Sequence, residues 1–315
     1  GIMGRYYAQH EEMPDEIAFA IEDHYRPRFA GDALPRNQVG IVVALADKFE
    51  TLVGMFGIGE KPTGDKDPFA LRRQALGIIR ILTEFNISLP LDELIKNAQA
   101  MLEDPGLADR AADDLLEKVW RHASEDAKVK EISIETSTPT FVNNWFEDLQ
   151  QFIFERFAGL LREQGFSAQE VDAVLSLRPQ LLSEVPIRLT AVRAFAALPE
   201  AAALAAANKR VGNILKKVEG GVSGAVNDKL LHEPAEQALH QALSRIAPKA
   251  EAAFAASDYT ASLQALAALK EPVDAFFDSV MVMVESETLR KNRLALLADL
   301  RDAMNRVADI ARLAA

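Results

Sequence analysis

The chain has 315 residues, and its 35 Lys and Arg against 47 Asp and Glu give a formal net charge of −12 at pH 7. It has no Cys, which excludes disulfide scaffolds, thiolate zinc sites and Cys nucleophiles. No run of about 18 apolar residues occurs, so we expect no membrane-spanning segment. Because net charge acts at long range while contacts are local, an acidic chain can still carry a basic binding surface.

Helical periodicity dominates the first 86 residues. The predicted elements are a helix over about 14–24, a buried helix over 39–56, a Gly-rich loop over 57–67 and a helix over 69–83. Asp67 and Pro68 precede the last of these helices, and we expect them to be its N-cap and first residue.

The helical pattern continues to the end of the chain with one interruption. Glu131–Val142 is rich in β-branched residues and is expected to form a short hairpin or an ordered loop. Phe141–Gln164 is predicted to be an amphipathic helix, and Ser167 caps the next one. From residue 199 onward the pattern is Ala-rich helix, with breaks or first turns at Pro234, Pro248 and Pro272 and a cap at Ser286. The fold class predicted is therefore all-α.

The Gly-rich loop has the glycine spacing of a phosphate-binding loop at Gly59 and Gly64. Asp65 stands where that motif needs Lys, and the preceding element is a predicted helix rather than a strand. We therefore favour a structural loop over a phosphate site. Asp65 and Asp67 could hold a divalent ion, but a turn and a helix cap explain them better.

A possible metal centre is suggested by the order His10, Asp23–His24 and Asp47, which echoes the metal-binding residues of HD-type hydrolases. The adjacent pair is reversed, however, so surface or capping histidines are the favoured interpretation. The residues alone therefore predict neither a catalytic residue nor a metal ligand.

Three groups of basic residues are candidate phosphate contacts because residues seven apart share a helix face. The first two lie late in the chain: Lys209, Arg210, Lys216 and Lys217; and Arg290, Lys291 and Arg293. The third is Arg73 and Arg80, with Gly77 between them leaving room for a phosphate backbone. A solvated helix face is the alternative for each group, and Arg73 could simply pair with Asp65 or Asp67. The pair Phe276–Phe277 and the run Val280–Val284, which alternates Val and Met, are expected to be core, with a subunit interface as the alternative.

Specific strings then point to a family. In chain order they are 4–8 (GRYYA), 24–25, 29–32 (FAGD), 44–48, 51–54, 56–59, 62–73, 75–77, 206–211 (AANKRV), 213–215, 275–278, 280–284, 290 and 292–294. They closely resemble the C-terminal half of bacterial glycyl-tRNA synthetase β subunits, with KDPFALRR at 66–73 the most specific. Two features depart from the family: Glu50 stands where Asp is common, and residues 103–142 match poorly.

The resemblance implies a degenerate HD-like helical domain over 1–198, with a variable segment near 103–142. It implies a helical-bundle anticodon-binding domain over 199–315, similar to that of arginyl-tRNA synthetase. The chain would be a non-catalytic, tRNA-binding part of a ligase that attaches glycine to its tRNA. The expected partners are glycine tRNA and an α subunit in an α2β2 assembly, in the cytoplasm and away from membranes. ATP and Mg²⁺ would bind that α subunit, so this part alone would be inactive and hold no cofactor.

Within the implied anticodon domain, Lys and Arg would position phosphates, and Asn208, Asn213 or Asn292 could reach base edges. Arg73 and Arg80 would contact tRNA or the α subunit. Two other functions stay open. An HD-type metal phosphohydrolase would need a metal near Asp47, and a purely structural helical scaffold would use its basic rows only as solvated faces.

Overall fold

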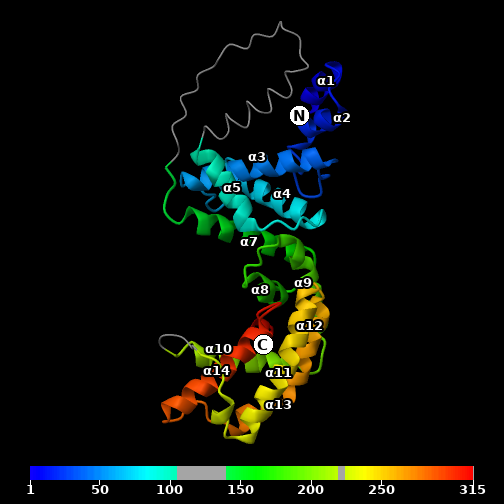
Figure 1. The fold of residues 1–315 in the computed structure, drawn as a ribbon. Coiled ribbons are helices and arrows are strands. Elements are labelled where there is room, and N and C mark those ends of the chain that lie inside the picture. Colours follow the sequence, from blue (N-terminus) through cyan, green and yellow to red (C-terminus); the bar gives the residue numbers. More distant parts are fainter. Residues whose placement is uncertain (105–139, 219–223, 315) are drawn as a thin grey trace. The chain divides into compact units, whose positions relative to one another are not determined.

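The computed structural model describes residues 1–104, 140–218 and 224–314 (Figure 1). Every regular element in these ranges is a helix, apart from one isolated bridge between Thr63 and Lys66. The all-α prediction is thus confirmed for the described residues. Residues 131–139 of the predicted hairpin or loop lie outside them, and residues 140–142 are not helical.

The chain packs into two compact units. The first comprises Gly1–Phe157 and Gln180–Ser183. Its helices are α1 (Ile2–His10), α2 (Asp15–Asp23), α3 (Gln38–Gly57), α4 (Leu71–Glu84), α5 (Leu91–Glu103) and the part of α7 (Trp145–Glu163) up to Phe157. Helix α1 packs on α2, α2 on α3, and α3 on both α4 and α5. The long apolar helix α3 is therefore the centre of this unit, with Leu52 and Val53 fully buried.

The second unit comprises Ala158–Pro179 and Glu184–Ala315. Its elements are α8 (Ala168–Leu175), α9 (Val185–Ala196), α10 (Ala201–Leu215), η2 (Asp228–Leu230), α11 (Pro234–Ala255), α12 (Tyr259–Leu266), η3 (Ala267–Leu269), α13 (Lys270–Ser279), α14 (Glu287–Met304) and η4 (Ile310–Leu313); η1 (Leu182–Glu184) precedes α9. Helix α11 packs on α12 and α13, while α10 packs on α14 and η4. These contacts leave one side of α10 uncovered, which matters for the site.

Local signals set several helix boundaries as predicted. Ser167 caps α8 and forms a reciprocal capping box with Glu170. Pro234 begins α11, where its missing N–H costs nothing. Other boundaries differ from the prediction. Pro248 lies inside α11 instead of breaking it, α4 begins at Leu71 rather than Phe69, and α7 begins at Trp145 rather than Phe141.

Asp67 nevertheless caps α4 from a distance. Ala70, not Asp67, is the N-cap residue, and it has a positive φ of 55°. The Asp67 carboxylate accepts hydrogen bonds from the backbone N–H of Leu71 at 2.8 Å and of Arg72 at 3.0 Å. Asp67 therefore satisfies two of the orphan donors at the start of the helix, although the turn between them is longer than predicted.

The segment Val280–Val284 follows α13 as an irregular stretch with a bend at Val282 and Met283, and its side chains from Val280 to Met283 alternate between the core and solvent. Val280 and Val282 are each 7% exposed, whereas Met281 is 72% and Met283 56% exposed. The prediction of a core run therefore holds for Val280 and Val282, while Val284 is partly exposed and both methionines are exposed. Val280 itself has extended backbone angles, which send the side chains of successive residues to opposite sides.

The predicted division into domains at residues 198 and 199 stays a prediction. Among the described residues, no single helix is both long and apolar enough to cross a membrane. The bent pair Leu182–Ala196 and Ala201–Leu215, which meet at 110°, reaches that length and composition only when the two are counted together.

Candidate functional site

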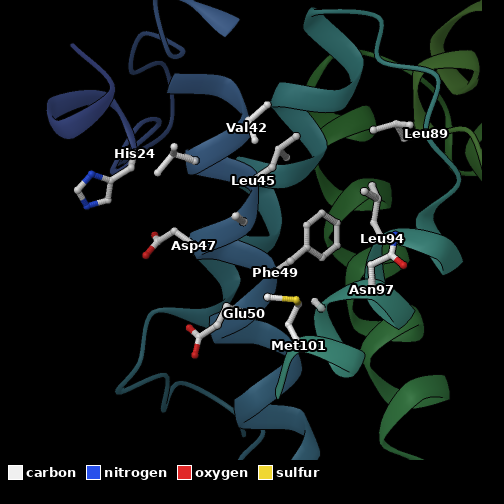
Figure 2. Close-up of a pocket in the computed structure, with 13 residues that line it drawn as sticks. His24, Val42, Leu45, Asp47, Phe49, Glu50, Leu89, Leu94, Asn97 and Met101 are labelled. Carbon is white, nitrogen blue, oxygen red and sulfur yellow. The ribbon is translucent and has the colours of Figure 1, made fainter. Parts of the chain in front are cut away.

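A cavity of about 760 Å³ borders α3 and α5 in the first unit. His24 and Asp47, two members of the predicted metal-binding order, line it together with mostly apolar side chains. In Figure 2, His24 and Asp47 point away from the side on which Phe49 and Met101 lie. Within the described ranges, no group of three His, Asp or Glu side chains is placed to hold a metal ion.

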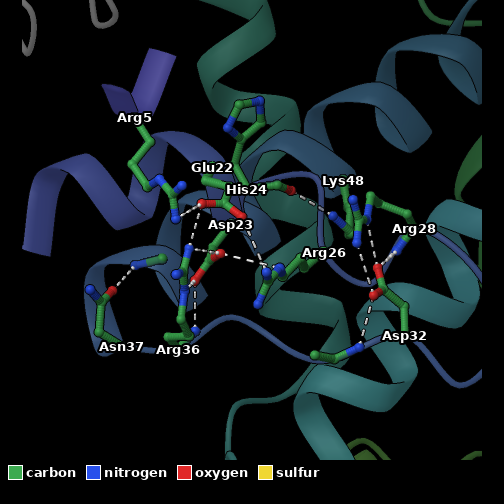
Figure 3. A network of polar contacts seen from close by, with 12 residues as sticks. Arg5, Glu22, Asp23, His24, Arg26, Arg28, Asp32, Arg36, Asn37 and Lys48 are labelled. Carbon is green, nitrogen blue, oxygen red and sulfur yellow. Dashed lines mark hydrogen bonds and ion pairs between the residues drawn. The ribbon is translucent and has the colours of Figure 1, made fainter. Parts of the chain in front are cut away.

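Asp23, the third member of that order, is surrounded by arginines instead (Figure 3). Its carboxylate is fully buried and accepts hydrogen bonds from the backbone N–H, Nε and Nη2 of Arg36, each at 2.8 Å. Arg26 Nε lies 3.2 Å from the same carboxylate. Burial opposes ionisation of Asp23, but the hydrogen bonds from Arg36 and the charges of Arg26 and Arg36 together outweigh it and hold the pKa below its usual value. The oxygens that a metal would need are thus occupied by guanidinium groups.

Lys48 adds a buried cation to the same unit. Its side chain is 1% exposed, and Nζ donates a hydrogen bond to the backbone oxygen of His24 at 2.8 Å. Burial lowers the pKa of Lys48, and the charge of neighbouring Asp47 opposes that shift. The ammonium group therefore ties α3 to the end of α2.

The predicted space for a phosphate backbone beside Gly77, between Arg73 and Arg80, does not exist. Gly77 is buried, and a Cβ there would lie 2.7 Å from Lys48 Cε, so the lysine stem fills the space between the two arginines. Arg80 donates to Glu84 at 2.7 Å and to the backbone oxygen of Asp32 at 2.9 Å. Arg73 is exposed and forms no ion pair with a described residue, so its predicted alternative pairing with Asp65 or Asp67 does not form either.

The Gly-rich loop is held by internal contacts. Thr63 and Lys66 exchange backbone hydrogen bonds across a turn at Gly64, and Lys61 forms an ion pair with Asp148. Gly59 and Gly64 both have positive φ, which explains why glycines recur there. The favoured interpretation as a structural loop agrees with these contacts.

The first basic group lies on the uncovered side of α10 and directly after its last residue, Leu215. All five of its predicted contact residues are exposed: Lys209, Arg210, Asn213, Lys216 and Lys217. In the part of the chain that the structure describes, none of the four cations forms an ion pair. The Arg210 guanidinium lies 4.3 Å from the ring centre of Phe277, which holds it in place without neutralising its charge. We call these five residues the α10 cluster.

The second basic group is arranged differently. Arg293 is 5% exposed, forms an ion pair with the fully buried Glu236 and donates to the backbone oxygen of Met281 at 2.7 Å. Arg290 is partly exposed and donates to the backbone oxygen of Val284 at 3.1 Å. Lys291 is exposed beside Glu287, 2.7 Å away. Arg293 is therefore part of the interior and cannot meet a phosphate at the surface.

The three asparagines are also separated by burial. Asn208 is 1% exposed and donates to Asn305 Oδ1 at 2.7 Å. Asn292 is 5% exposed and exchanges two hydrogen bonds with the backbone of Asn227. Only Asn213 of these three is free to face a ligand at the surface.

Phe277 is the contact that sequence reasoning missed, because the pair Phe276–Phe277 was interpreted as core. Phe276 is fully buried, whereas Phe277 is half-buried under Arg210. Consecutive residues of a helix point about 100° apart, so two adjacent aromatic rings rarely enter one core together. The adjacency of the two phenylalanines therefore indicates that one of them lies outside the core.

Comparison with known proteins identifies the family. The family model described as glycyl-tRNA synthetase beta subunit matches residues 1–176, and the DALR anticodon binding domain model matches residues 204–311. The glycine–tRNA ligase beta subunits of Methylobacillus flagellatus and Janthinobacterium sp. are each 58% identical over the whole chain, which covers 40% of each of those proteins. That of Nitrosomonas europaea is 57% identical, with 41% of it covered. Because the first model covers more than half of the residues, the chain belongs to the glycyl-tRNA synthetase beta subunit family.

Proposed function

We propose that this chain is a non-catalytic, tRNA-binding part of a glycine–tRNA ligase beta subunit, and that the α10 cluster contacts the anticodon arm of glycine tRNA. This proposal rests on one observation: the four cations of the cluster are exposed and form no ion pair with a described residue. They are Lys209, Arg210, Lys216 and Lys217. They lie within the stretch that matches the anticodon-binding domain model. Unneutralised cations at helical spacing suit a phosphate backbone.

The division of labour within the cluster follows from its chemistry. Lys and Arg side chains would position the RNA through its phosphates, because they are donors without acceptor capacity. Asn213 carries both a donor and an acceptor, so it is the candidate to contact a base edge in an open loop. Lys291 and Arg290 would add positive charge at the start of α14. Arg293 would make no contact with the RNA, because it is paired with buried Glu236. Arg73 is kept as a lesser contact with tRNA or a partner subunit.

The remaining parts of the proposal concern the larger enzyme. Adenylate formation, ATP and Mg²⁺ would belong to an α subunit, with which the beta subunit forms an α2β2 assembly in the cytoplasm. A metal phosphohydrolase is disfavoured because Arg36 and Arg26 occupy the carboxylate of Asp23.

The test is a titration of labelled glycine tRNA into the purified chain, beside a tRNA with both anticodon cytosines changed. We expect tighter binding to the natural anticodon. Replacing Lys209 and Arg210 together by Ala should weaken that binding about tenfold, since two phosphate contacts are lost.

The matched control is Arg245→Ala with Lys249→Ala, which removes two exposed cations from α11. This variant should bind glycine tRNA like the unchanged chain. Equal loss in both double variants, or equal binding of both RNAs, would support the alternative of a helical scaffold whose cations are only solvated.

A further inference from the structure

The cavity beside α3 and α5 is an open groove with apolar walls. Several of its apolar side chains are exposed and are not covered by any described part of the chain. Val42 is 65% exposed, Leu89 45%, Met101 42% and Val43 40%. Together with the buried side chains of Phe49 and Leu45 and other lining residues, they enclose a volume of about 760 Å³. Exposed apolar side chains gathered at one place mark an interaction surface, whereas isolated ones need no explanation.

Both walls of the groove repeat at helical spacing. On α3 the lining residues Val42, Val43, Ala46 and Phe49 follow one another at intervals of one, three and three. On α5 they are Leu94, Asn97, Ala98 and Met101, which is the i, i+3, i+4, i+7 pattern. Figure 2 shows Phe49 of α3 directed toward Leu94 and Asn97 of α5. Two neighbouring helices that each expose an apolar stripe form a groove into which a third, amphipathic helix can pack.

One edge of the groove is acidic. Asp47 and Glu50 line it from α3, three residues apart, and Figure 2 shows both carboxylates on the side of α3 away from α5. Neither carboxylate forms an ion pair with any residue that the structure describes. The buried ammonium of Lys48 acts on Asp47 only electrostatically and donates its hydrogen bond to His24. The edge therefore offers two charges to an incoming partner.

We propose that this groove binds an amphipathic helix of a protein partner, with apolar residues seated between α3 and α5 and Lys or Arg residues along the flank that faces Asp47 and Glu50. The apolar walls supply affinity, and the two carboxylates fix the orientation of the helix. This surface lies in the first unit and is distinct from the α10 cluster, so it does not depend on the proposed tRNA contact.

The probe is a stapled helical peptide with Leu at i, i+3, i+4 and i+7 and two Lys along one flank. Its counterpart has Glu in place of both Lys. Fluorescence anisotropy with the whole 315-residue chain should show the Lys peptide binding about fivefold tighter than the Glu peptide. Charge reversal of both carboxylates, Asp47→Lys with Glu50→Lys, should invert that preference.

A second variant tests the apolar part. Val42→Asp places a charge inside the groove and should weaken the Lys peptide about tenfold or more. Ile187→Asp is the matched control, because Ile187 is 51% exposed and lies in the second unit. It should leave peptide binding unchanged, and both Val42→Asp and Ile187→Asp should keep the affinity of the unchanged chain for glycine tRNA.

Three results would overturn the proposal: equal binding of both peptides, no binding of either, or equal losses for Val42→Asp and Ile187→Asp. A photo-reactive residue at position 42 that cross-links only within its own chain would also overturn it, since the groove would then already be filled. Loss of tRNA affinity without loss of peptide binding would concern the α10 cluster alone.

Discussion

Gly77 shows how one missing side chain can serve the interior rather than a ligand. The stem of Lys48 crosses α4 at this residue, and the lysine ammonium is anchored to the backbone oxygen of His24. A methyl group at position 77 would meet Lys48 Cε at 2.7 Å and Cδ at 3.0 Å. Because Lys48 is buried and tethered, it has little room to move aside.

We predict that Gly77→Ala destabilises the chain by about 1–2 kcal/mol, although Ala is the better helix former by about 1 kcal/mol. The steric conflict with Lys48 outweighs the gain in helix propensity. Denaturant unfolding measures the effect. Gly159→Ala in α7 is the control, because nothing lies within 4 Å of its Cβ position, and it should stabilise. Equal gains in both variants would show that Lys48 moves freely.

At the scale of elements, helix α8 is fixed by a single carboxylate. Glu170 accepts a hydrogen bond from the backbone N–H of Ser167 at 2.7 Å, and from Arg193 Nε at 2.7 Å and Nη2 at 3.0 Å. The hydrogen bonds from Arg193, helped by Ser167 and opposed by burial, lower the pKa of Glu170 to about 2. The helix start and the neighbouring α9 thus share one anion.

Glu170→Gln should lower the free energy of unfolding at neutral pH by about 1–2 kcal/mol, since half-exposed Arg193 keeps its charge and loses its partner. The folded pKa lies below the unfolded value near 4.5, so the wild-type advantage is present above pH 4.5 and is lost as pH falls toward 2. Unfolding at a series of pH values measures the difference. Glu163→Gln, at an exposed residue of α7, should show no such trend.

Elements and parts of the site differed in how far the sequence could predict them. The helix over 39–56 was found to within one residue at each end, because its apolar pattern and flanking loops are local signals. The exposure of Lys209 and Lys216 also followed from local spacing. The burial of Arg293 could not be predicted, because its partner Glu236 lies 57 residues earlier in the chain. Whether a cation is free depends on such distant contacts.

At the scale of the whole molecule, the charge of −12 and the α10 cluster act in opposite directions. The net charge repels RNA at long range, while the four cations on α10 and just after its end attract it at short range. Added salt screens both effects, but only the contacts release counterions from the RNA.

We therefore predict a slope of about −3 for the logarithm of glycine tRNA affinity against the logarithm of salt concentration, if the four cations meet phosphates of an open loop. Lys209→Ala with Arg210→Ala should reduce the slope to about −1.4, since two contacts remain. The Arg245→Ala and Lys249→Ala variant should keep the original slope. Titration of the tRNA at several salt concentrations measures the slope. If replacing Lys209 and Arg210 left the slope unchanged, these residues would not contact phosphates.

The alternation of Val280–Val284 has a chemical consequence. Both thioether groups stand in solvent, while the side chains that anchor the segment are hydrocarbon and inert to oxidants. Conversion of Met281 or Met283 to the sulfoxide would add a polar oxygen only on the solvent-exposed side, where it is readily hydrated. Val280 and Val282 would keep their packing, so we expect oxidation of these two methionines to leave the fold intact.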